Sequence, residues 1–294
     1  MSAAGQKGIA LVLVLWITVL LAITSGAFAL MARMDQLEAN ALLSGTQARM
    51  IAESGIHLTA VMMRDQDDMT RMVADGRTYQ QTLDGVLLEI RVTDERGKLD
   101  INAADEQTLF TLFANHGLEI DQAELLAAAV MDWRDSDEIE RVNGAEVDTY
   151  LSAGLPIGPA NRNFMMIDEL LQVLGMSYSL FRQIEPGITV FSRTALPDIS
   201  FAPVAALLAI PDLSLDDATT FVQERNMLEP GDIRSVALPD GQLVMAQGRG
   251  LTYSIQAKAT MPNGVWEQLE ATIRLGGSPD GMPFRILRWR EGFH

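Results

Sequence analysis

Carboxylate side chains gather in one short stretch near the middle of the 294-residue chain. Asp135 and Asp137 alternate along the chain and can point toward one position, and Gly144 permits a sharp return toward the acidic residues that follow it. Such hard oxygen ligands suit calcium, which accepts about six to eight oxygens in a loose geometry. The candidate calcium ligands are Asp132, Asp135, Asp137, Glu138, Glu146 and Asp148. The ligand spacing of an EF-hand is absent, and a solvated acidic loop at a helix end is the alternative interpretation.

Few other groups in the sequence could carry out catalysis. There are three histidines and no cysteine, which excludes a thiol nucleophile, a disulfide and a cysteine-ligated metal site. No nucleophile-elbow motif and no phosphate-binding glycine loop of the established kinds is present. His57 is interpreted as a helix residue near a sheet. We therefore expect no catalytic residues, and a signal-anchored periplasmic enzyme is kept only as an alternative.

An apolar run from Ile9 to Ala32 contains no charged residue. This run decides on which side of a membrane the acidic groups lie. Its length exceeds the roughly 20 apolar residues that an α-helix needs to cross the hydrocarbon core of a bilayer. We expect it to span a membrane. Lys7 precedes the run, so the body that follows should lie outside the cytoplasm.

Three interpretations of this segment compete. A cleaved secretory signal would use the small-residue pattern Ala27-Phe28-Ala29, although the apolar run is longer than a usual signal core. A plain signal anchor would keep the whole chain, with Lys7 on the cytoplasmic side. The third interpretation rests on Gly5-Gln6-Lys7-Gly8, a short basic leader that ends in glycine and abuts the apolar run without a spacer.

This leader resembles those of type IV pilins and pseudopilins. A prepilin peptidase cuts after the glycine in that class, so the resemblance implies cleavage between Gly8 and Ile9 and N-methylation of Ile9. Most members carry a glutamate at the fifth mature position, where this chain has Leu13. Within type II secretion the missing glutamate is a mark of the K-type minor pseudopilins, which are thought to sit at the fibre tip. Any signal anchor would also lack it.

The segment after the apolar run has the pattern of a helix that lies on a sheet. Residues 33–64 contain no proline and keep apolar or small residues near helical spacing. We expect one helix to continue from the bilayer through this segment. A break near Ser44-Gly45, followed by a separate amphipathic helix, is the alternative.

Strand patterns lie on both sides of a helical middle region. Val86–Asp94 alternates as a strand does, and Gly187–Ser192 is a further candidate strand. Leu251–Thr260 and Trp266–Leu275 are joined by a turn that contains Asn263-Gly264, a strong hairpin signal. The economical topology is therefore an antiparallel sheet that a helical insert interrupts.

The helical regions contain two weak copies of a small helical unit, one in the insert and one after it. The first follows Asn102, a suitable helix cap, and the second follows Asp198. Both resemble helix-hairpin-helix modules, some of which bind DNA. The hairpins Asn115-His116-Gly117-Leu118 and Pro211-Asp212-Leu213 have no basic flank, and the net charge is −17 at pH 7. Since binding to nucleic acid requires neutralisation of phosphates, we expect no nucleic-acid partner.

The order of motifs in the middle region resembles the insert of the K-type pseudopilins. The motifs are Asp100-Ile101-Asn102-Ala103-Ala104, the run Asp132–Glu138, Gly144-Ala145-Glu146, Asp168-Glu169-Leu170-Leu171 and Pro186–Val190. That family binds calcium in its helical insert. The resemblance therefore implies a structural calcium ion held by the acidic stretch.

The sequence thus predicts an α+β protein with a long N-terminal transmembrane pilin-type helix packed on an antiparallel sheet, and a large helical insert of the helix-hairpin-helix or SAM-like kind. The expected parts are the leader 1–8, the transmembrane helix 9–32, the periplasmic helix and first strand or strands 33–100, the insert 101–186, a strand and second helical unit 187–250, the hairpin 251–275 and a tail 276–294 without an assigned role.

The resemblance implies a minor pseudopilin of the type II secretion system that initiates or caps a fibre for export of folded proteins across the outer membrane. Expected partners are other minor pseudopilins, the major pseudopilin, the prepilin peptidase and the inner membrane. We expect a single-pass protein of the bacterial inner membrane with its C-terminal body in the periplasm. A minor pilin of a type IV pilus is the alternative function.

Overall fold

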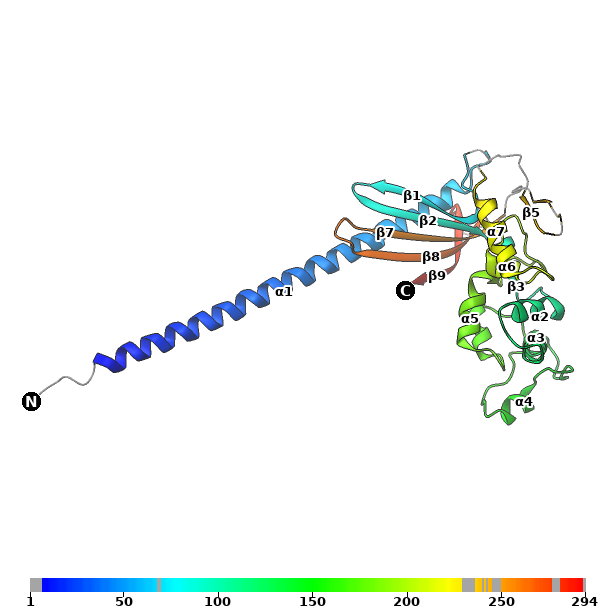
Figure 1. The fold of residues 1–294 in the computed structure, drawn as a ribbon, viewed down its shortest axis with the longest axis horizontal. Helices are drawn as coiled ribbons and strands as arrows, with labels where there is room; N and C mark the ends of the chain where they lie inside the picture. The colour runs from blue at the N-terminus through cyan, green and yellow to red at the C-terminus, as the bar shows by residue number, and fades with distance from the viewer. Residues whose placement is uncertain are drawn as a thin grey trace, which may run out of the picture.

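A long helix protrudes from a body of strands and short helices (Figure 1). The computed structural model describes residues 7–292, with gaps at 68–69, 229–235, 240, 242, 245–249 and 277–280. Helix α1 (Lys7–Met62) contains the predicted membrane-spanning run and nearly all of the helix predicted over residues 33–64. The alternative break near Ser44-Gly45 is wrong, because α1 continues through both residues. No proline removes a backbone donor from this segment, so the helix can remain continuous.

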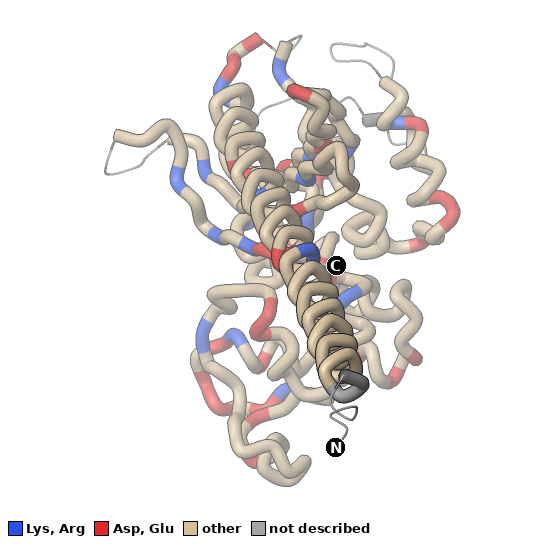
Figure 2. Tube along the Cα trace, turned by 90° about the vertical axis from the view of Figure 1, so that its left-hand side faces the viewer, with Lys and Arg blue, Asp and Glu red and all other residues tan. Residues whose placement is uncertain are grey.

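The composition of α1 changes along its length, and each half of the helix matches a different environment. Residues 10–32 are exposed all round, and Figure 2 shows this part of the helix without acidic or basic residues. Among the described residues, α1 is the one helix that is long and apolar enough to cross a membrane. From Ala48 onward, one face of α1 is buried against the body. The same helix is therefore suited to lipid in its first half and to a protein core in its second.

Five strands form the main antiparallel sheet in the order β1-β2-β7-β8-β9. Their bounds are β1 (Asp75–Leu83), β2 (Val86–Asp94), β7 (Thr252–Thr260), β8 (Trp266–Leu275) and β9 (Phe284–Glu291). The strand predicted at Val86–Asp94 is β2, and the predicted hairpin is β7–β8 with Gly264 at φ 84° in its turn. The sequence did not predict β1, and β9 lies in the predicted tail.

The sheet buries one face against α1. Leu88, Ile90 and Val92 alternate along β2 and join alternating residues of β7 and β8 in one core. Small residues bring the helix close to the strands: a Cβ on Gly55 would lie 3.2 Å from the methyl carbons of Leu88. Because side chains alternate along a strand, the intervening residues of β2, β7 and β8 point away from α1.

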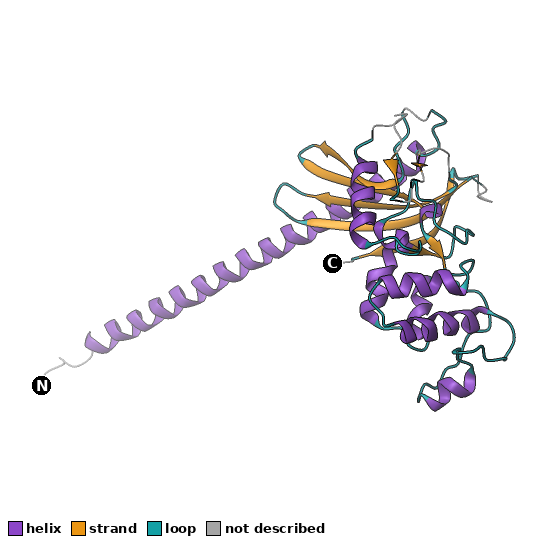
Figure 3. Ribbon diagram, turned by 45° about the vertical axis from the view of Figure 1, so that its right-hand side comes forward, coloured by secondary structure: helices purple, strands orange, loops and turns teal. Residues whose placement is uncertain are grey.

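The insert between β2 and the later strands consists of short helices that group beyond one end of the sheet (Figure 3). Its elements are α2 (Glu106–Asn115), α3 (Ile120–Arg134), α4 (Val147–Ser152), η2 (Ile167–Gln172), α5 (Tyr178–Ile184) and η3 (Glu185–Gly187). Their buried side chains form a second core, separate from that of the sheet. The predicted α+β fold with a helical insert is confirmed.

The predicted helix cap at Asn102 is wrong. Helix α2 begins at Glu106, and the side chain of Asp105 accepts a hydrogen bond of 2.8 Å from the backbone N–H of Thr108. Asn102 instead donates to the carbonyl oxygen of Phe164 (2.9 Å) and accepts from its N–H (2.8 Å). Both residue types cap helices well, so only the contact with Phe164 decides between them.

The chain enters and leaves the insert at neighbouring positions. β3 (Leu99–Asp100) pairs in parallel with β4 (Ile188–Thr189), and Leu99 is the partner of Ile188. The strand predicted over Gly187–Ser192 is therefore too long, and it lies outside the main sheet. The insert is attached through this pair as a closed loop whose two ends meet.

A second small helical unit packs near the β3–β4 pair, where the chain enters and leaves the insert. It contains α6 (Val204–Leu207) and α7 (Leu215–Asn226), followed by the short strands β5 (Val236–Ala237) and β6 (Leu243–Val244). The remainder of the predicted 187–250 part includes residues outside those that are described. A Cβ on Gly97, in η1 (Glu95–Gly97), would lie 2.5 Å from the carbonyl carbon of Phe201, so the backbones touch there.

The C-terminal strand links the sheet to the insert. On β9, Arg288 forms an ion pair of 3.0 Å with Asp168 in η2, and Arg290 forms another with Glu185 in η3. The part of the predicted tail that the structure describes thus includes an edge strand with contacts to both halves of the body.

Candidate cation site in the helical insert

Helix α3 brings the first candidate ligand into the core of the insert. Its buried face is rich in alanine, and Asp132 occupies a position on that face near the C-terminal end, where it is fully buried. Trp133 follows it and stacks on Phe164, with ring centroids 5.9 Å apart. A carboxylate in such surroundings requires donors or a cation.

Asp132 accepts hydrogen bonds from the backbone of the acidic loop and so fixes the path of that loop. Its Oδ2 accepts from the backbone N–H of Ala145 (2.9 Å) and of Arg141 (3.3 Å), and its Oδ1 lies 3.1 Å from Nε of Arg141. Gly144 is required in this loop because a Cβ there would lie 2.0 Å from Oδ2 of Asp132. Asn143 precedes it with φ 66°, a left-handed conformation that asparagine tolerates. The sharp return predicted at Gly144 is thus present.

Of the remaining candidate calcium ligands, two make contacts within the loop and two face solvent. Asp135 forms an ion pair of 3.2 Å with Arg141, and Asp137 accepts from the N–H of Ile139 (2.9 Å). Glu138 and Asp148 are exposed. Within the described part of the chain, no group of three or more His, Cys, Asp or Glu side chains is arranged to hold a metal ion.

Glu146 is the electrostatically unbalanced member of the set. It is buried at the start of α4, and neither of its carboxylate oxygens has a hydrogen-bond partner. Burial, and then the negative charges of Asp132, Asp135 and other nearby carboxylates, raise the pKa of Glu146 to about 7. Burial also raises the pKa of Asp132.

The orphaned oxygens test whether a cation fits. Oδ1 of Asp135 and both carboxylate oxygens of Glu146 are buried without a hydrogen bond, and Oδ1 of Asp132 has only the ion pair with Arg141. These groups are hard oxygen donors that calcium prefers, and a divalent cation would offset their mutual repulsion. The donor set therefore fits calcium in chemistry, with Asp132, Asp135 and Glu146 as the central residues.

Sequence analysis missed Arg141 and Glu140. Arg141 contacts both Asp132 and Asp135, and Glu140 accepts a hydrogen bond of 2.6 Å from the hydroxyl of Thr149 in α4. The presence of Arg141 next to an acidic run was the available signal, because buried carboxylates attract a cationic partner. Tyr150 of α4 then anchors this end of the loop, since its hydroxyl accepts from the N–H of Leu174 (3.0 Å).

Comparisons with known proteins agree on one family. A family model described as type II secretion system (T2SS), protein K, matches residues 87–193. Proteins named type II secretion system protein K from Pectobacterium carotovorum subsp. carotovorum and from Klebsiella pneumoniae are each 27% identical to this chain, over 75% of both chains. A chain in the solved GspK-GspI-GspJ complex of enterotoxigenic Escherichia coli has a similar fold, with a TM-score of 0.56 and 18% identity over 90% of this chain and 99% of that one.

The raised pKa of Glu146 predicts a pH dependence of stability in the presence of a chelator. Between pH 4.5 and about 7, Glu146 stays protonated in the folded state but is ionised in the unfolded state. The free energy of unfolding should therefore fall as pH rises through this range. Glu146→Gln should remove the part of this fall that Glu146 causes and raise the melting temperature at pH 8 by on the order of a few degrees. Thermal melts from pH 4 to pH 8 measure it.

Glu124→Gln is the matched control, because Glu124 is exposed on the same helix that carries Asp132. It should melt with the pH profile of the parent chain. A Glu146→Gln variant that melts lower than the parent at pH 8 in chelator would contradict the electrostatic account.

Proposed function

This chain belongs to the type II secretion system protein K family, whose members are minor pseudopilins, and we propose that it initiates and caps the secretion fibre from the inner membrane. The observation that carries the proposal is the arrangement of one long helix with a wide body at its far end (Figure 1). The role is structural rather than catalytic, in keeping with a family of secretion subunits.

The anchor supports assembly by lateral packing of helices. At about 1.5 Å per residue, the 56 residues of α1 extend for roughly 84 Å, more than twice the hydrocarbon core of a bilayer. Beyond the apolar run, Leu42, Leu43 and Met50 remain exposed on α1. These side chains offer a helix-packing surface to other minor pseudopilins and to the major pseudopilin, with the body in the periplasm. The related solved chain is part of a complex with GspI and GspJ.

Two features support a position at the tip. The insert and the second helical unit widen the body beyond the end of the sheet, so a further subunit would meet them before it could stack (Figure 3). In addition, Leu13 replaces the membrane carboxylate that would pair with the N-terminal amine of a neighbouring subunit. We infer that this subunit begins a fibre and that none is added above it.

We also propose that calcium stabilises the insert. Asp132, Asp135 and Glu146 would hold the ion, with Asp137, Glu138 and Asp148 as the outer candidates. The ion would supply positive charge to buried oxygens that lack hydrogen bonds and would fasten the end of α3 to the start of α4. The chain's own part is to place these carboxylates through the Asp132–Ala145 and Asp132–Arg141 contacts.

Processing of the leader tests the pilin-class assignment. The chain recovered from cells that contain a prepilin peptidase should begin at N-methylated Ile9, as N-terminal sequencing and intact mass would report. Gly8→Val should leave the leader attached, because the peptidase requires a small residue there, whereas Gly26→Val should be cut normally. A mature N-terminus after Ala29 would exclude a retained helix.

Calcium binding predicts a rise in melting temperature between chelator and excess calcium, because a ligand that binds only the folded state stabilises it. Glu146→Gln should abolish most of that rise, and Glu124→Gln should keep it. Equal melting of the parent chain in chelator and in calcium would refute a structural calcium ion without affecting the tip assignment.

Deletion of residues 101–185 tests capping. A short Gly-Ser linker can close the gap because Leu99 and Ile188 are paired neighbours. The deleted chain should either fail to start fibres or permit abnormal elongation, measured by fibre number and length in electron micrographs and by export of a folded protein. The control carries the same linker inserted after Gly154, a surface turn residue, and keeps the insert. Normal fibres and export in the deletion strain would count against capping.

A further inference from the structure

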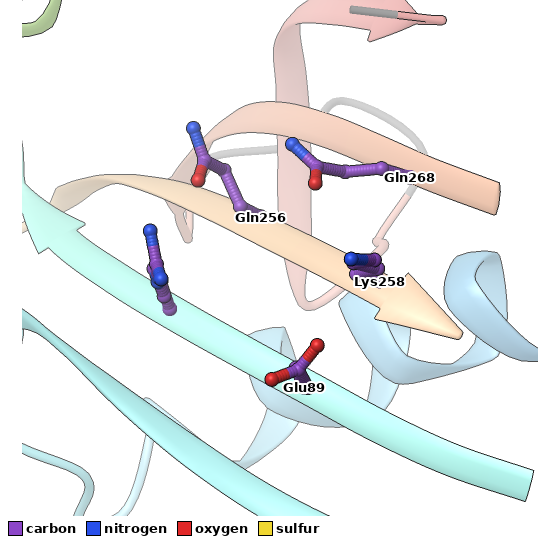
Figure 4. A pocket seen from close by; sticks show the side chains of 5 residues that line it. Glu89, Gln256, Lys258 and Gln268 are labelled. Atoms are coloured by element: carbon purple, nitrogen blue, oxygen red, sulfur yellow. The ribbon is translucent and has the colours of Figure 1, made fainter. Parts of the chain in front are cut away.

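The face of the main sheet that points away from α1 is polar from strand to strand. Register and alternation place the following residues on it: Thr78, Gln80, Glu89, Arg91, Thr93, Ser254, Gln256, Lys258, Gln268, Glu270, Thr272, Arg288 and Arg290. Figure 4 shows Glu89, Gln256, Lys258 and Gln268 rising from β2, β7 and β8 on one side of the sheet. Leu87 and Trp266 share this face near one end of the strands. The rest of the face is polar, so its side chains are available for polar contacts.

The insert forms the second wall of a cleft over part of this face. The cleft has a volume of about 720 Å³ and lies between the strands on one side and η2, η3 and β4 on the other. A smaller hollow of about 230 Å³ adjoins it further along the sheet. Arg91 and Gln256 line both, so the two form one continuous groove.

The groove concentrates positive charge in an acidic protein. It is lined by six Lys or Arg and five Asp or Glu, against 22 and 39 in the whole chain. Among the described residues neither Arg91 nor Lys258 forms an ion pair: Arg91 donates to the hydroxyl of Thr78 (2.8 Å), and Lys258 lies 4.8 Å from the ring centroid of Trp266.

The acidic residues of the groove are already engaged. Glu185 contacts both Arg182 (2.7 Å) and Arg290, so two cations share one carboxylate there. Glu89 accepts from the side-chain amide of Gln80 (2.9 Å), and Glu270 accepts from that of Gln256 (2.8 Å). Neutral amides do not cancel the charges of Glu89 and Glu270, so the lining of the groove carries a net charge of +1 in a chain of −17. This local balance favours an anionic ligand.

Apolar side chains stand at the insert wall of the same groove. Met165 and Met166 are 69% and 52% exposed, and Phe191 also lines the cleft. Exposed methionines adapt to varied partner side chains. A ligand that fits this wall together with the cations carries both apolar groups and carboxylates.

We propose that this groove binds an extended acidic peptide segment of a partner protein. Its carboxylates meet Arg91 and Lys258 on the sheet, and its apolar side chains lie against Met166 and Phe191. The proposal concerns a different surface from the helix contacts and the cation site, and it does not depend on a position at the fibre tip.

Binding of defined peptides to the full chain in detergent micelles tests the proposal. The probes are the hexapeptide Leu-Asp-Leu-Asp-Leu-Asp with a neutral fluorophore and its Asn counterpart, followed by fluorescence anisotropy. The acidic peptide should bind about ten-fold more tightly than the neutral one, and its affinity should fall as NaCl is added, since the contacts are charged. Equal affinity of the two peptides, or no binding of the acidic one, overturns the proposal.

The double variant Arg91→Gln/Lys258→Gln should weaken binding of the acidic peptide about ten-fold, which corresponds to two partly exposed ion pairs. The matched control Arg33→Gln/Arg285→Gln changes the net charge equally with exposed residues outside the groove, and it should bind within about two-fold of the parent chain. Melting temperatures verify that both variants fold. An equal loss in both variants would mean that total charge, not the groove, attracts the peptide.

Discussion

The packing of α1 against the sheet is the contact on which the rest of the structure depends. Ala48, Ala52 and Gly55 remove side-chain bulk from the buried stripe of α1, so the helix can approach the Leu88 side chain closely. The first half of the same helix is apolar on every side and needs no partner in a bilayer, where all its backbone groups bond internally. A continuous helix thus joins a membrane segment to a folded body without a flexible linker. Because α1 covers one face of the sheet, the other face is left to the insert.

The insert is attached through a small number of close contacts. The β3–β4 pair brings its two ends together, and Gly97 lets the backbone at Phe201 lie against the entry point. The ion pairs of Arg288 and Arg290 then join it to the last strand of the sheet. Both arginines are mostly covered and Glu185 is nearly buried, so these pairs are less screened by solvent than surface ion pairs. The C-terminal strand, a part of the chain to which the sequence assigned no role, therefore contributes to the orientation of the insert, together with the contact of Glu95 with Ser254 in β7.

The elements that the sequence predicted are those that bury a regular pattern. Val86–Asp94 and the strands of the hairpin each place alternating apolar residues in the core, and that alternation is visible in the sequence. The edge strands lack it: Tyr79 is the one residue of β1 that packs against the sheet core from the Thr78–Leu83 stretch, and arginines interrupt β9. Asn102 shows a second limit, because a cap and a tertiary hydrogen bond draw on the same side-chain chemistry. Local sequence does not reveal that Phe164 lies opposite.

In the candidate cation site, the sequence indicated which acidic residues come together but not which contacts each of them makes. Asp132 organises the loop through backbone donors, and Arg141 supplies positive charge to Asp132 and Asp135. Glu146 receives neither, although it is buried among the same carboxylates. Protonation of Glu146 relieves the repulsion only up to its pKa of about 7, whereas a divalent cation would also relieve it at higher pH by serving several oxygens at once. Arg141 is partly exposed, so its side chain can leave the carboxylates for solvent when a stronger cation takes its place. A cation bound beside Glu146 would therefore reconcile the burial of this carboxylate with its charge, which is the physical basis of the proposed calcium site.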